Sequence, residues 1–572
     1  MNSSSSENAQ PSRSRGLIVA AIVVLGFVAY ANTFQGEFVW DDASSILLHE
    51  NVQDTSKFFQ LFGQDQHAFA GGQGNFYRPL VSASFMLDYA LSRPKSSSTG
   101  PPSSSIPEPG TFFFHLSSVS WHVLATVFLF LLMSALGAPR LVCAVVPLVY
   151  VVHPLHTEAV AYISGRADSM SATFMFAGLW WSTRDGSRKI YFMSTLAVIL
   201  CFTGALLSKE SALIFPVLLL MTLLLRHATQ DAEDRLPLGL RLLPAIASLT
   251  VLGGYIYLRT TLLNFGSDTQ ALNTSLSTRA LETLQAFALY IKLILLPTGL
   301  HMERTLLDTP SWVAGLGAAM LLVILGATGY ALKIKKYRLA LGTGWFLVTW
   351  LPISGLFPLN APMAEHWLYV PLAGGLWAVA ELLWSERRPV LVKRTAVAAC
   401  ILWCAMLLAQ TVERNADWHD NESLYLATLD KNPDSRRVRY NLAVTYEDLL
   451  DNPYGARRHY EKVLDAFEEY KSTSSIGTDT FWDEELQSHH SLGTLHLDAK
   501  KYPEALEHFY ILLNIRPDDK NRILIASAAF KSGQYFLTVA GNRDQAESLF
   551  RHAVELEPRL LPNVRAMMGP GF

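Results

Sequence analysis

Long apolar runs recur over the first 412 residues of the chain, and short polar segments separate one run from the next. A helix that crosses the hydrocarbon core of a bilayer needs about 20 consecutive apolar residues. The pattern therefore predicts an all-α, polytopic membrane bundle of about eleven spans, at residues 17–34, 113–136, 139–153, 168–183, 190–207, 211–225, 243–259, 311–332, 338–352, 368–385 and 395–412. The composition agrees, since 50% of the residues are hydrophobic and 17% are charged.

Basic residues in the connecting segments predict the orientation of these spans, because Lys and Arg accumulate on the cytoplasmic side of membranes. One face collects most of them, namely Arg13, Arg15, Arg140, Arg184, Arg188, Lys189, Arg226, Arg235, Arg241, Lys333, Lys335, Lys336, Arg338, Arg387, Arg388, Lys393 and Arg394. Residues 1–16 are then a cytoplasmic tail. The large loop 35–112 and the chain after residue 412 lie on the non-cytoplasmic face.

The first apolar run is expected to remain as a membrane anchor. It is longer than the apolar region of a signal peptide, and it ends without a small-x-small cleavage pattern. Residues 17–412 are therefore taken as one membrane domain.

Two apolar stretches are not counted as spans. Residues 284–297 are short, contain Lys292 and follow a polar loop, and counting them would put the basic cluster KIKKYR outside. We expect a helix there that lies in the interface or re-enters the membrane. A similar helix is predicted near residues 76–91, followed by a Ser-, Pro- and Gly-rich linker at 96–110.

After residue 412 the sequence becomes charged and amphipathic, and a repeat appears. One unit has the spacing of a tetratricopeptide repeat at Leu492, Gly493, Ala505, Phe509 and Pro517. A degenerate unit before it, with a turn one residue longer, and a further unit after it carry Leu442, Ala443, Tyr446, Ala456, Tyr460, Ala546, Phe550, Ala553 and Pro558. Residues 413–572 are therefore expected to form a solenoid of about three repeats.

Charge and cysteine content narrow the classes of partner. The formal net charge of -3 gives no indication of a nucleic-acid partner. The cysteines lie within or beside apolar runs, so neither a disulfide framework nor a zinc site is predicted: Cys143, Cys201, Cys400 and Cys404. No cofactor is predicted.

Two adjacent acids, Asp41 and Asp42, follow the first span in the segment GEFVWDDASS. Carboxylates are expensive to hold beside lipid, so a pair at this place favours a water-filled site. The alternative is that both acids only solvate the end of a helix.

A second charged segment, HPLHTEAVAYISGRADSM at residues 153–170, has Glu158 and Asp168 on either side of Arg166. Charges this close to the end of a span predict a loop folded over a site. The histidines of this segment match no standard zinc spacing, so no metal site is named, and the question of a divalent metal stays open.

Several segments together resemble the transmembrane-and-tetratricopeptide-repeat O-mannosyltransferases, which are glycosyltransferases of the GT-C class. They occur in order along the chain: FVWDD at 38–42, YRPL at 77–80, the 153–170 segment, SKES at 208–211, LLP followed by Leu300 and Glu303, and AEHWLYVPLAG at 364–374. The resemblance implies a GT-C fold. It also implies inverting transfer of a sugar, mannose by resemblance only, from a polyprenyl-phosphate donor to protein Ser or Thr hydroxyls on the non-cytoplasmic side.

The resemblance also implies roles for single residues. Asp41 is expected to be the base that takes the acceptor's proton, with Asp42 as the alternative. The side chains expected at the lipid phosphate or the sugar are Arg78, Glu158, Arg166, Asp168, Lys209, Glu303, Arg304 and His366, with Arg78 and Arg166 the first choices for phosphate. Relatives commonly carry Arg at the position of His366, and a His there is expected to bind phosphate more weakly and in a pH-dependent way.

Partners and location follow from the same features. The expected partners are the lipid-linked donor, membrane lipid and an acceptor protein or peptide held in the groove of the repeats. The short polar start and compact repeats favour a bacterial inner membrane with periplasmic repeats. The endoplasmic reticulum is the alternative, since Asn273 and Asn421 begin glycosylation sequons. The alternative function is a catalytically weak scaffold whose repeats assemble envelope proteins.

Overall fold

The computed structural model of the chain describes residues 12–67, 76–92, 109–184, 187–229, 237–263, 275–306, 309–356, 359, 361–384, 389–473, 482–516 and 518–572. These residues form helices and loops, with one isolated bridge between Arg304 and Met363 and no strand among them, which confirms the predicted all-α class. Most of the predicted linker lies outside the described residues, as do Arg235, Asn273, Arg387, Arg388 and Pro517. The chain divides into two compact units, Met1–Leu424 and Tyr425–Phe572.

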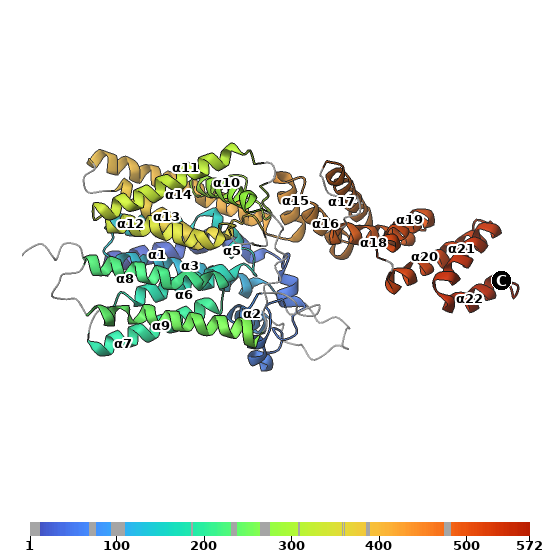
Figure 1. Cartoon of the computed structure of the whole chain (residues 1–572), viewed down its shortest axis with the longest axis horizontal. Coiled ribbons are helices and arrows are strands. Elements are labelled where there is room, and N and C mark those ends of the chain that lie inside the picture. The colour runs from blue at the N-terminus through green and yellow to red at the C-terminus, as the bar shows by residue number, and fades with distance from the viewer. Residues whose placement is uncertain are drawn as a thin grey trace, which may run out of the picture. The chain divides into compact units, whose positions relative to one another are not determined.

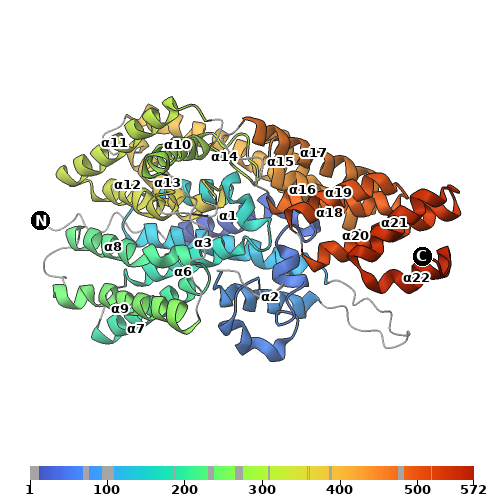
Figure 2. The same cartoon turned by 45° about the vertical axis from the view of Figure 1, so that its right-hand side comes forward.

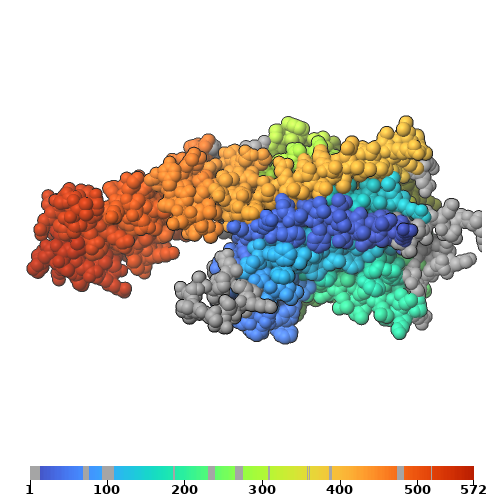
Figure 3. Space-filling model, turned by 180° about the vertical axis from the view of Figure 1, so that it is seen from behind, coloured from blue at the N-terminus to red at the C-terminus, as the bar shows by residue number. Residues whose placement is uncertain are grey.

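A helix lies at each of the eleven predicted spans in the first unit (Figure 1). They are α1 (Ser12–Ala29), α3 (Phe112–Ala135), α4 (Arg140–Val151), α6 (Arg166–Trp181), α7 (Arg188–Leu206), α8 (Phe215–Thr229), α9 (Leu238–Tyr257), α11 (Trp312–Lys333), α12 (Tyr337–Trp350), α13 (Tyr369–Leu383) and α14 (Val390–Asp417). α6 packs against α3, α7 and α8, and Figure 2 shows α3, α6 and α8 lying alongside one another. In Figure 3, α1 lies on the surface of this unit between α3 and α14.

The chain is an integral membrane protein. Among the described residues, six helices are long and apolar enough to cross a membrane, or seven if the bent pair Arg140–Val151 and Pro154–Val160 forms one span. This number is smaller than the predicted eleven because several of the helices are short. α6, for example, has 16 residues, so it rises only about 24 Å, whereas the hydrocarbon core is about 30 Å thick.

Close helix packing in the bundle depends on small residues. A Cβ added at Gly342 of α12 would lie 2.8 Å from the backbone nitrogen of Ala378 in α13. A Cβ added at Gly374 of α13 would lie 2.8 Å from the backbone nitrogen of Phe346 in α12. Glycine at both positions lets the two backbones approach each other, as is common between membrane helices.

The basic residues and the charged motifs lie at opposite ends of these helices. Short connections make consecutive helices antiparallel, so Arg140 at the start of α4 lies at the same end as Arg184, just after α6. Arg166 at the start of α6 and His366 just before α13 lie at the other end. The functional motifs are therefore gathered at the end of the bundle away from the basic residues.

The apolar stretch 284–297 belongs to α10 (Leu276–Leu295), which begins eight residues earlier than the stretch predicted. α10 is not among the helices long and apolar enough to span. Thr283 near its start lies with Ser354 after α12 in one cavity, and the carbonyl of Ile294 near its end lies 3.1 Å from His153 Nε2 after α4. Both halves of α10 therefore lie at the end of the bundle that holds the charged motifs. The second predicted short helix is α2 (Pro79–Ser92), which packs on α3 and α6.

The second unit consists of helices that pack in sequential order. After α15 (Asn421–Lys431), which crosses the boundary between the units, come α16 (Arg436–Val444), α17 (Pro453–Thr473), α18 (Asp483–Asp498), α19 (Tyr502–Ile515), α20 (Asp519–Thr538), α21 (Arg543–Leu556) and α22 (Leu561–Met568). From α16 to α21 each helix packs against the next. This arrangement is consistent with the predicted tetratricopeptide solenoid.

Most of the described repeat-pattern residues are buried between these helices. Phe509 of α19 is fully buried against α18, where a Cβ added at Gly493 would lie 2.4 Å from its ring. The degenerate first repeat contains a π-helical turn at Thr445–Leu449, which follows α16. Since a π-turn holds one extra residue, it accounts for the longer turn expected there.

Candidate active site

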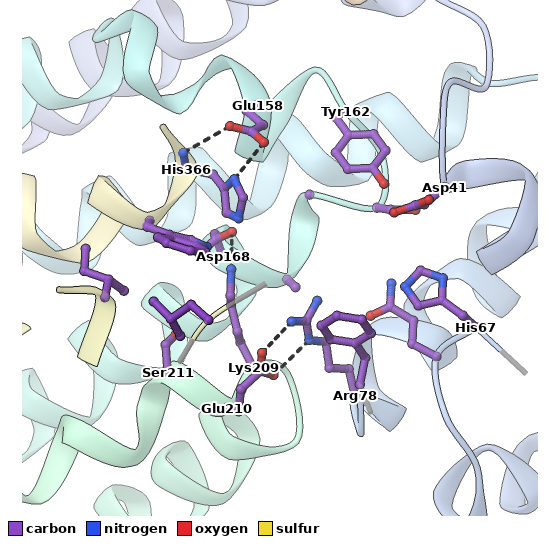
Figure 4. A pocket seen from close by; sticks show the side chains of 18 of the residues that line it. Asp41, His67, Arg78, Glu158, Tyr162, Asp168, Lys209, Glu210, Ser211 and His366 are labelled. Atoms are coloured by element: carbon purple, nitrogen blue, oxygen red, sulfur yellow. Dashed lines mark hydrogen bonds and ion pairs between the residues drawn. The ribbon is translucent and has the colours of Figure 1, made fainter. Parts of the chain in front are cut away.

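A cavity of about 360 Å³ lies where the charged motifs of the first unit meet (Figure 4). Segments that are far apart in the sequence line it: the loop after α1, the residues before α2, the segment between α4 and α6, the segment between α7 and α8, and the residues before α13. Six of the predicted site residues are brought together there, namely Asp41, Arg78, Glu158, Asp168, Lys209 and His366. Asp42, Arg166, Glu303 and Arg304 do not line the cavity.

The two adjacent acids have different surroundings. Asp41 lines the cavity, and Figure 4 shows it beside His67 and Tyr162. Asp42 is fully buried, and its Oδ1 accepts hydrogen bonds from the backbone N–H of Ser164 at 2.8 Å and from the Ser164 hydroxyl at 2.6 Å. Its Oδ2 accepts from the backbone N–H of Val39 at 3.1 Å. Asp42 thus ties the loop after α1 to the segment before α6, and only Asp41 is placed to meet a substrate.

Burial of Asp42 predicts a pH-dependent contribution to stability. Desolvation raises the pKa of its carboxyl to about 7, although the hydrogen bonds from Ser164 and Val39 favour the charged form. The folded state therefore binds this proton more tightly than the unfolded state, and the stability it contributes is lost as pH rises from about 4 through about 7.

We expect Asp42→Asn to remove this pH dependence. The melting temperature of the native chain in detergent, minus that of Asp42→Asn, should fall as pH is raised over this interval. The buried histidines are the same in both proteins, so their contribution to the pH dependence of the melting temperature cancels in this difference. A difference that stays constant with pH would show that Asp42 is ionised throughout the interval.

Two cation–carboxylate pairs form part of the cavity wall. Arg78 donates to Glu210 through Nε at 3.0 Å and through a terminal nitrogen at 2.6 Å. Lys209 Nζ donates to Asp168 at 2.6 Å. The SKES segment thus supplies one member of each pair. A ligand phosphate can take the place of either carboxylate, because both cations bind anionic oxygens through charge-assisted hydrogen bonds.

A third pair joins two of the predicted motifs. His366 Nδ1 lies 2.7 Å from Glu158 Oε1, and the backbone N–H of His366 donates to Glu158 Oε2 at 3.2 Å. Glu158 is buried, whereas 24% of the His366 side chain remains exposed. Glu158 therefore orients the imidazole, and both residues line the cavity, with His366 the more exposed of the two.

Arg166, a first choice for phosphate, has a structural position instead. It is fully buried, forms an ion pair with Asp88 and donates to Ser84, Ser118 and the carbonyl of Phe114. These contacts use the guanidinium to join α2, α3 and α6. We therefore do not retain Arg166 among the phosphate-binding residues.

Glu303 and Arg304 also lie away from the cavity. Arg304 donates to Glu365 from Nε at 3.0 Å and from a terminal nitrogen at 2.6 Å. The same carboxylate accepts from the backbone N–H of His301 at 2.7 Å and lies 3.6 Å from Arg414. Arg304 therefore links the segment before α11 to the segment before α13. Glu303, beside it, is half-buried.

The structure adds cavity residues that the sequence interpretation did not name. His67 Nδ1 lies 2.9 Å from Ser45 Oγ and 3.1 Å from Ser44 Oγ, and burial lowers the pKa of His67 to about 4, helped by the nearby charges of Arg78 and His49. His67 is therefore neutral near pH 7. No sequence pattern marks it, because it lies in an irregular loop. Glu210, in contrast, is part of the SKES segment and could have been found as the partner of a cavity cation.

No group of three or more His, Cys, Asp or Glu side chains in the described part of the chain is arranged to hold a metal ion.

Comparison with known proteins finds relatives over most of the chain. A protein O-mannosyl-transferase of Caenorhabditis elegans is 25% identical over 450 residues, which cover 76% of this chain and 61% of the relative. The protein O-mannosyl-transferase TMTC4 of Mus musculus is 26% identical over 509 residues, covering 77% of this chain and 66% of the relative. The protein O-mannosyl-transferase TMTC3 of the same species is 22% identical over 591 residues, covering 94% and 60%.

These similarities confirm the resemblance that the motifs indicated. The chain spans about three fifths to two thirds of the length of these relatives. No protein-family model and no solved structure matches the chain. The relatives come from animals, so the comparisons give no support to the predicted preference for a bacterial inner membrane.

Proposed function

We propose that this chain is a membrane glycosyltransferase that moves mannose from a polyprenyl-phosphate donor to Ser or Thr hydroxyls of proteins. One observation carries the proposal: the carboxylate of Asp41, the cations Arg78 and Lys209 and the imidazole of His366 line the same cavity. Such a reaction requires a base for the acceptor hydroxyl and positive charge for the leaving phosphate. The names of the relatives support this class of reaction.

In this proposal the acceptor oxygen attacks the anomeric carbon of the donor as the bond to the phosphate oxygen breaks. Asp41 accepts the proton that the hydroxyl loses, and the bonding electron pair leaves with the lipid phosphate. The attack comes from the face opposite the leaving group, so the configuration at the anomeric carbon inverts. Neutral His67, which Figure 4 shows beside Asp41, supplies a hydrogen-bonding group for the acceptor or the sugar.

Arg78 and Lys209 hold the departing phosphate. Their present partners, Glu210 and Asp168, keep the two cations in place before the donor arrives. Arg78 suits a bidentate contact with phosphate, and Lys209 acts as a more compact charge. His366, held in place by Glu158, contributes a third hydrogen-bonding group.

The position of the cavity supports a non-cytoplasmic reaction in the endoplasmic reticulum. The cavity lies at the end of the bundle away from the basic residues, and basic residues mark the cytoplasmic side. The endoplasmic reticulum fits relatives that come from animals. The repeats of the second unit would then lie in the lumen, where an extended acceptor peptide can bind in their groove.

Loss of the Arg78 guanidinium should weaken donor binding. We expect Arg78→Gln to raise the KM for polyprenyl-phosphate-mannose roughly 10- to 100-fold, the effect of losing one or two charge-assisted hydrogen bonds. The rate of mannose transfer to a Ser/Thr peptide, measured at increasing donor concentration with purified protein in detergent, checks this.

Arg338→Gln is the matched control, since Arg338 also pairs with a carboxylate, Glu381 at 3.2 Å, but at the opposite end of the bundle. It should leave the KM unchanged. An unchanged KM in Arg78→Gln would remove Arg78 from the phosphate site. If neither the native chain nor the variants transfer mannose from any lipid-linked donor, the scaffold function is the better account.

A further inference from the structure

The backbone that presents Asp41 has an unfavourable conformation at the residue before it. Trp40 has a φ of 51°, in the left-handed region. This region is sterically unfavourable for a residue with a Cβ, so such a conformation persists only when its surroundings fix it. The turn also separates the two acids, because Asp41 faces the cavity while Asp42 points into the protein.

One contact that fixes this turn comes from the far end of the first unit. The backbone N–H of Trp40 donates to the side-chain Oδ1 of Asn421 at 2.8 Å, across 381 positions of sequence. Asn421 begins α15, but it is Asp420 that caps the helix, accepting from the backbone N–H of Ser423 at 2.7 Å. The amide oxygen of Asn421 therefore serves the Trp40 turn and not the helix that carries it.

An aromatic stack holds the side chain of Trp40 against the same segment. The Trp40 ring stacks on Tyr162 with centroids 5.6 Å apart, and Tyr162 stacks on Trp418 with centroids 5.3 Å apart. A backbone hydrogen bond of 2.7 Å from Glu37 to the carbonyl of His419 runs alongside. Residues 418–421 thus hold the loop that carries Asp41 in two ways. They bind its backbone at Glu37 and Trp40, and they support the Trp40 ring through Tyr162.

We infer that Asn421 is a positioning residue for the sugar transfer: its amide oxygen holds Trp40 in the left-handed turn that aims Asp41 into the cavity. The inference rests on the proposed function in taking Asp41 as the base. It also gives Asn421, the first residue of an Asn-Glu-Ser sequon, an internal role that does not depend on glycosylation.

Three variants of the whole chain test this inference by activity. Asn421→Leu keeps the size of the side chain and removes the acceptor oxygen. We expect its kcat to fall roughly 10- to 100-fold, because a displacement of about 1 Å at a reacting group has an effect of this order. The KM for polyprenyl-phosphate-mannose should stay within about twofold, since the cations of the cavity are untouched.

Asn421→Asp keeps a side-chain acceptor oxygen in the same place, so it should keep most of the native kcat. Ser423→Ala destroys the sequon but keeps the Asn421 amide, and should behave as the native chain. A native kcat in Asn421→Leu would overturn the inference. A loss in Ser423→Ala as large as in Asn421→Leu would also overturn it, because a missing glycan would then explain both.

A readout independent of activity separates this inference from the proposed function. In Asp41→Cys, a small charged thiol reagent should label position 41 from the cavity, and adding Asn421→Leu should slow that labelling at least several-fold. Equal labelling rates in the two proteins would show that Asn421 does not aim position 41. If the labelling differs but Asp41→Asn retains full transfer activity, Asn421 positions this residue and Asp41 is not the base.

Discussion

Replacing Asp41 by Asn is expected to lower the rate of mannose transfer about 10³-fold. Positioned general bases contribute typically 10²- to 10⁴-fold, and an amide cannot take the proton of the acceptor hydroxyl. The loss should appear in kcat, with donor affinity nearly unchanged, because the phosphate is held by Arg78 and Lys209. Single-turnover transfer from bound polyprenyl-phosphate-mannose measures the chemical step directly.

Asp42→Asn is the natural control for this prediction, since it makes the same change one residue later. Asp42 contacts Ser164 and Val39 and does not line the cavity. Its replacement should lower the melting temperature, and the rate of mannose transfer by the protein that remains folded should change little. A larger catalytic defect in Asp42→Asn than in Asp41→Asn would reverse the assignment of the two acids.

Arg166→Met is expected to destabilise the membrane unit by about 3–5 kcal/mol, the usual effect of removing one partner from a buried ion pair. The guanidinium of Arg166 is fully buried, and its partner Asp88 would keep a buried charge without compensation. Arg166→Lys should recover little of this loss, because an ammonium group cannot reach Asp88, two serine hydroxyls and the Phe114 carbonyl together. Thermal unfolding in detergent reports the change.

A double variant separates this structural role from a role in donor binding. Arg166→Met combined with Asp88→Leu removes both charges and should regain part of the lost stability. The folded fraction of each variant should bind the donor with native affinity. If the single variant melts as the native chain does and its KM for the donor rises, Arg166 is a phosphate ligand after all.

The membrane helices could be predicted from the sequence because every span is surrounded by the same apolar environment, lipid, which requires a long run of apolar residues. Apolar runs therefore mark them directly, and a helix lies at each of the eleven predicted places. α10 could be separated from the spans because its apolar run contains Lys292 and counting it conflicts with the distribution of basic residues. Helix length could not be predicted as well, since α6 has only 16 residues and is not among the helices long enough to span by themselves.

The site could be predicted only in part, because motifs identify segments and not directions. Asp41 and Asp42 are neighbours in one motif, yet a positive φ at Trp40 sends them to different places. Arg166 lies in the strongest motif, and its burial depends on Asp88, which is 78 positions away and in no motif. The motifs indicate these residues as candidates, and they do not say which of them face the cavity and which join helices.

The partners that fix the site are also distant in sequence. His67 belongs to an irregular loop, and its place in the cavity depends on Ser44 and Ser45. The sequence marks Asn421 only as the start of a sequon, whereas its amide oxygen accepts a hydrogen bond from the backbone N–H of Trp40. Hydrogen bonds of this kind follow from tertiary structure, and no local periodicity predicts them.

The measurement that tests the central claim most directly is transfer of labelled mannose from polyprenyl-phosphate-mannose to a Ser/Thr peptide by the purified chain. Native protein and Asp41→Asn would be compared at equal folded concentration, with the linkage of the product analysed. The account predicts mannosyl-Ser or mannosyl-Thr of inverted anomeric configuration from the native chain and about 10³-fold less from the variant. Equal transfer by the two proteins, or a product that retains the configuration of the donor, would contradict it.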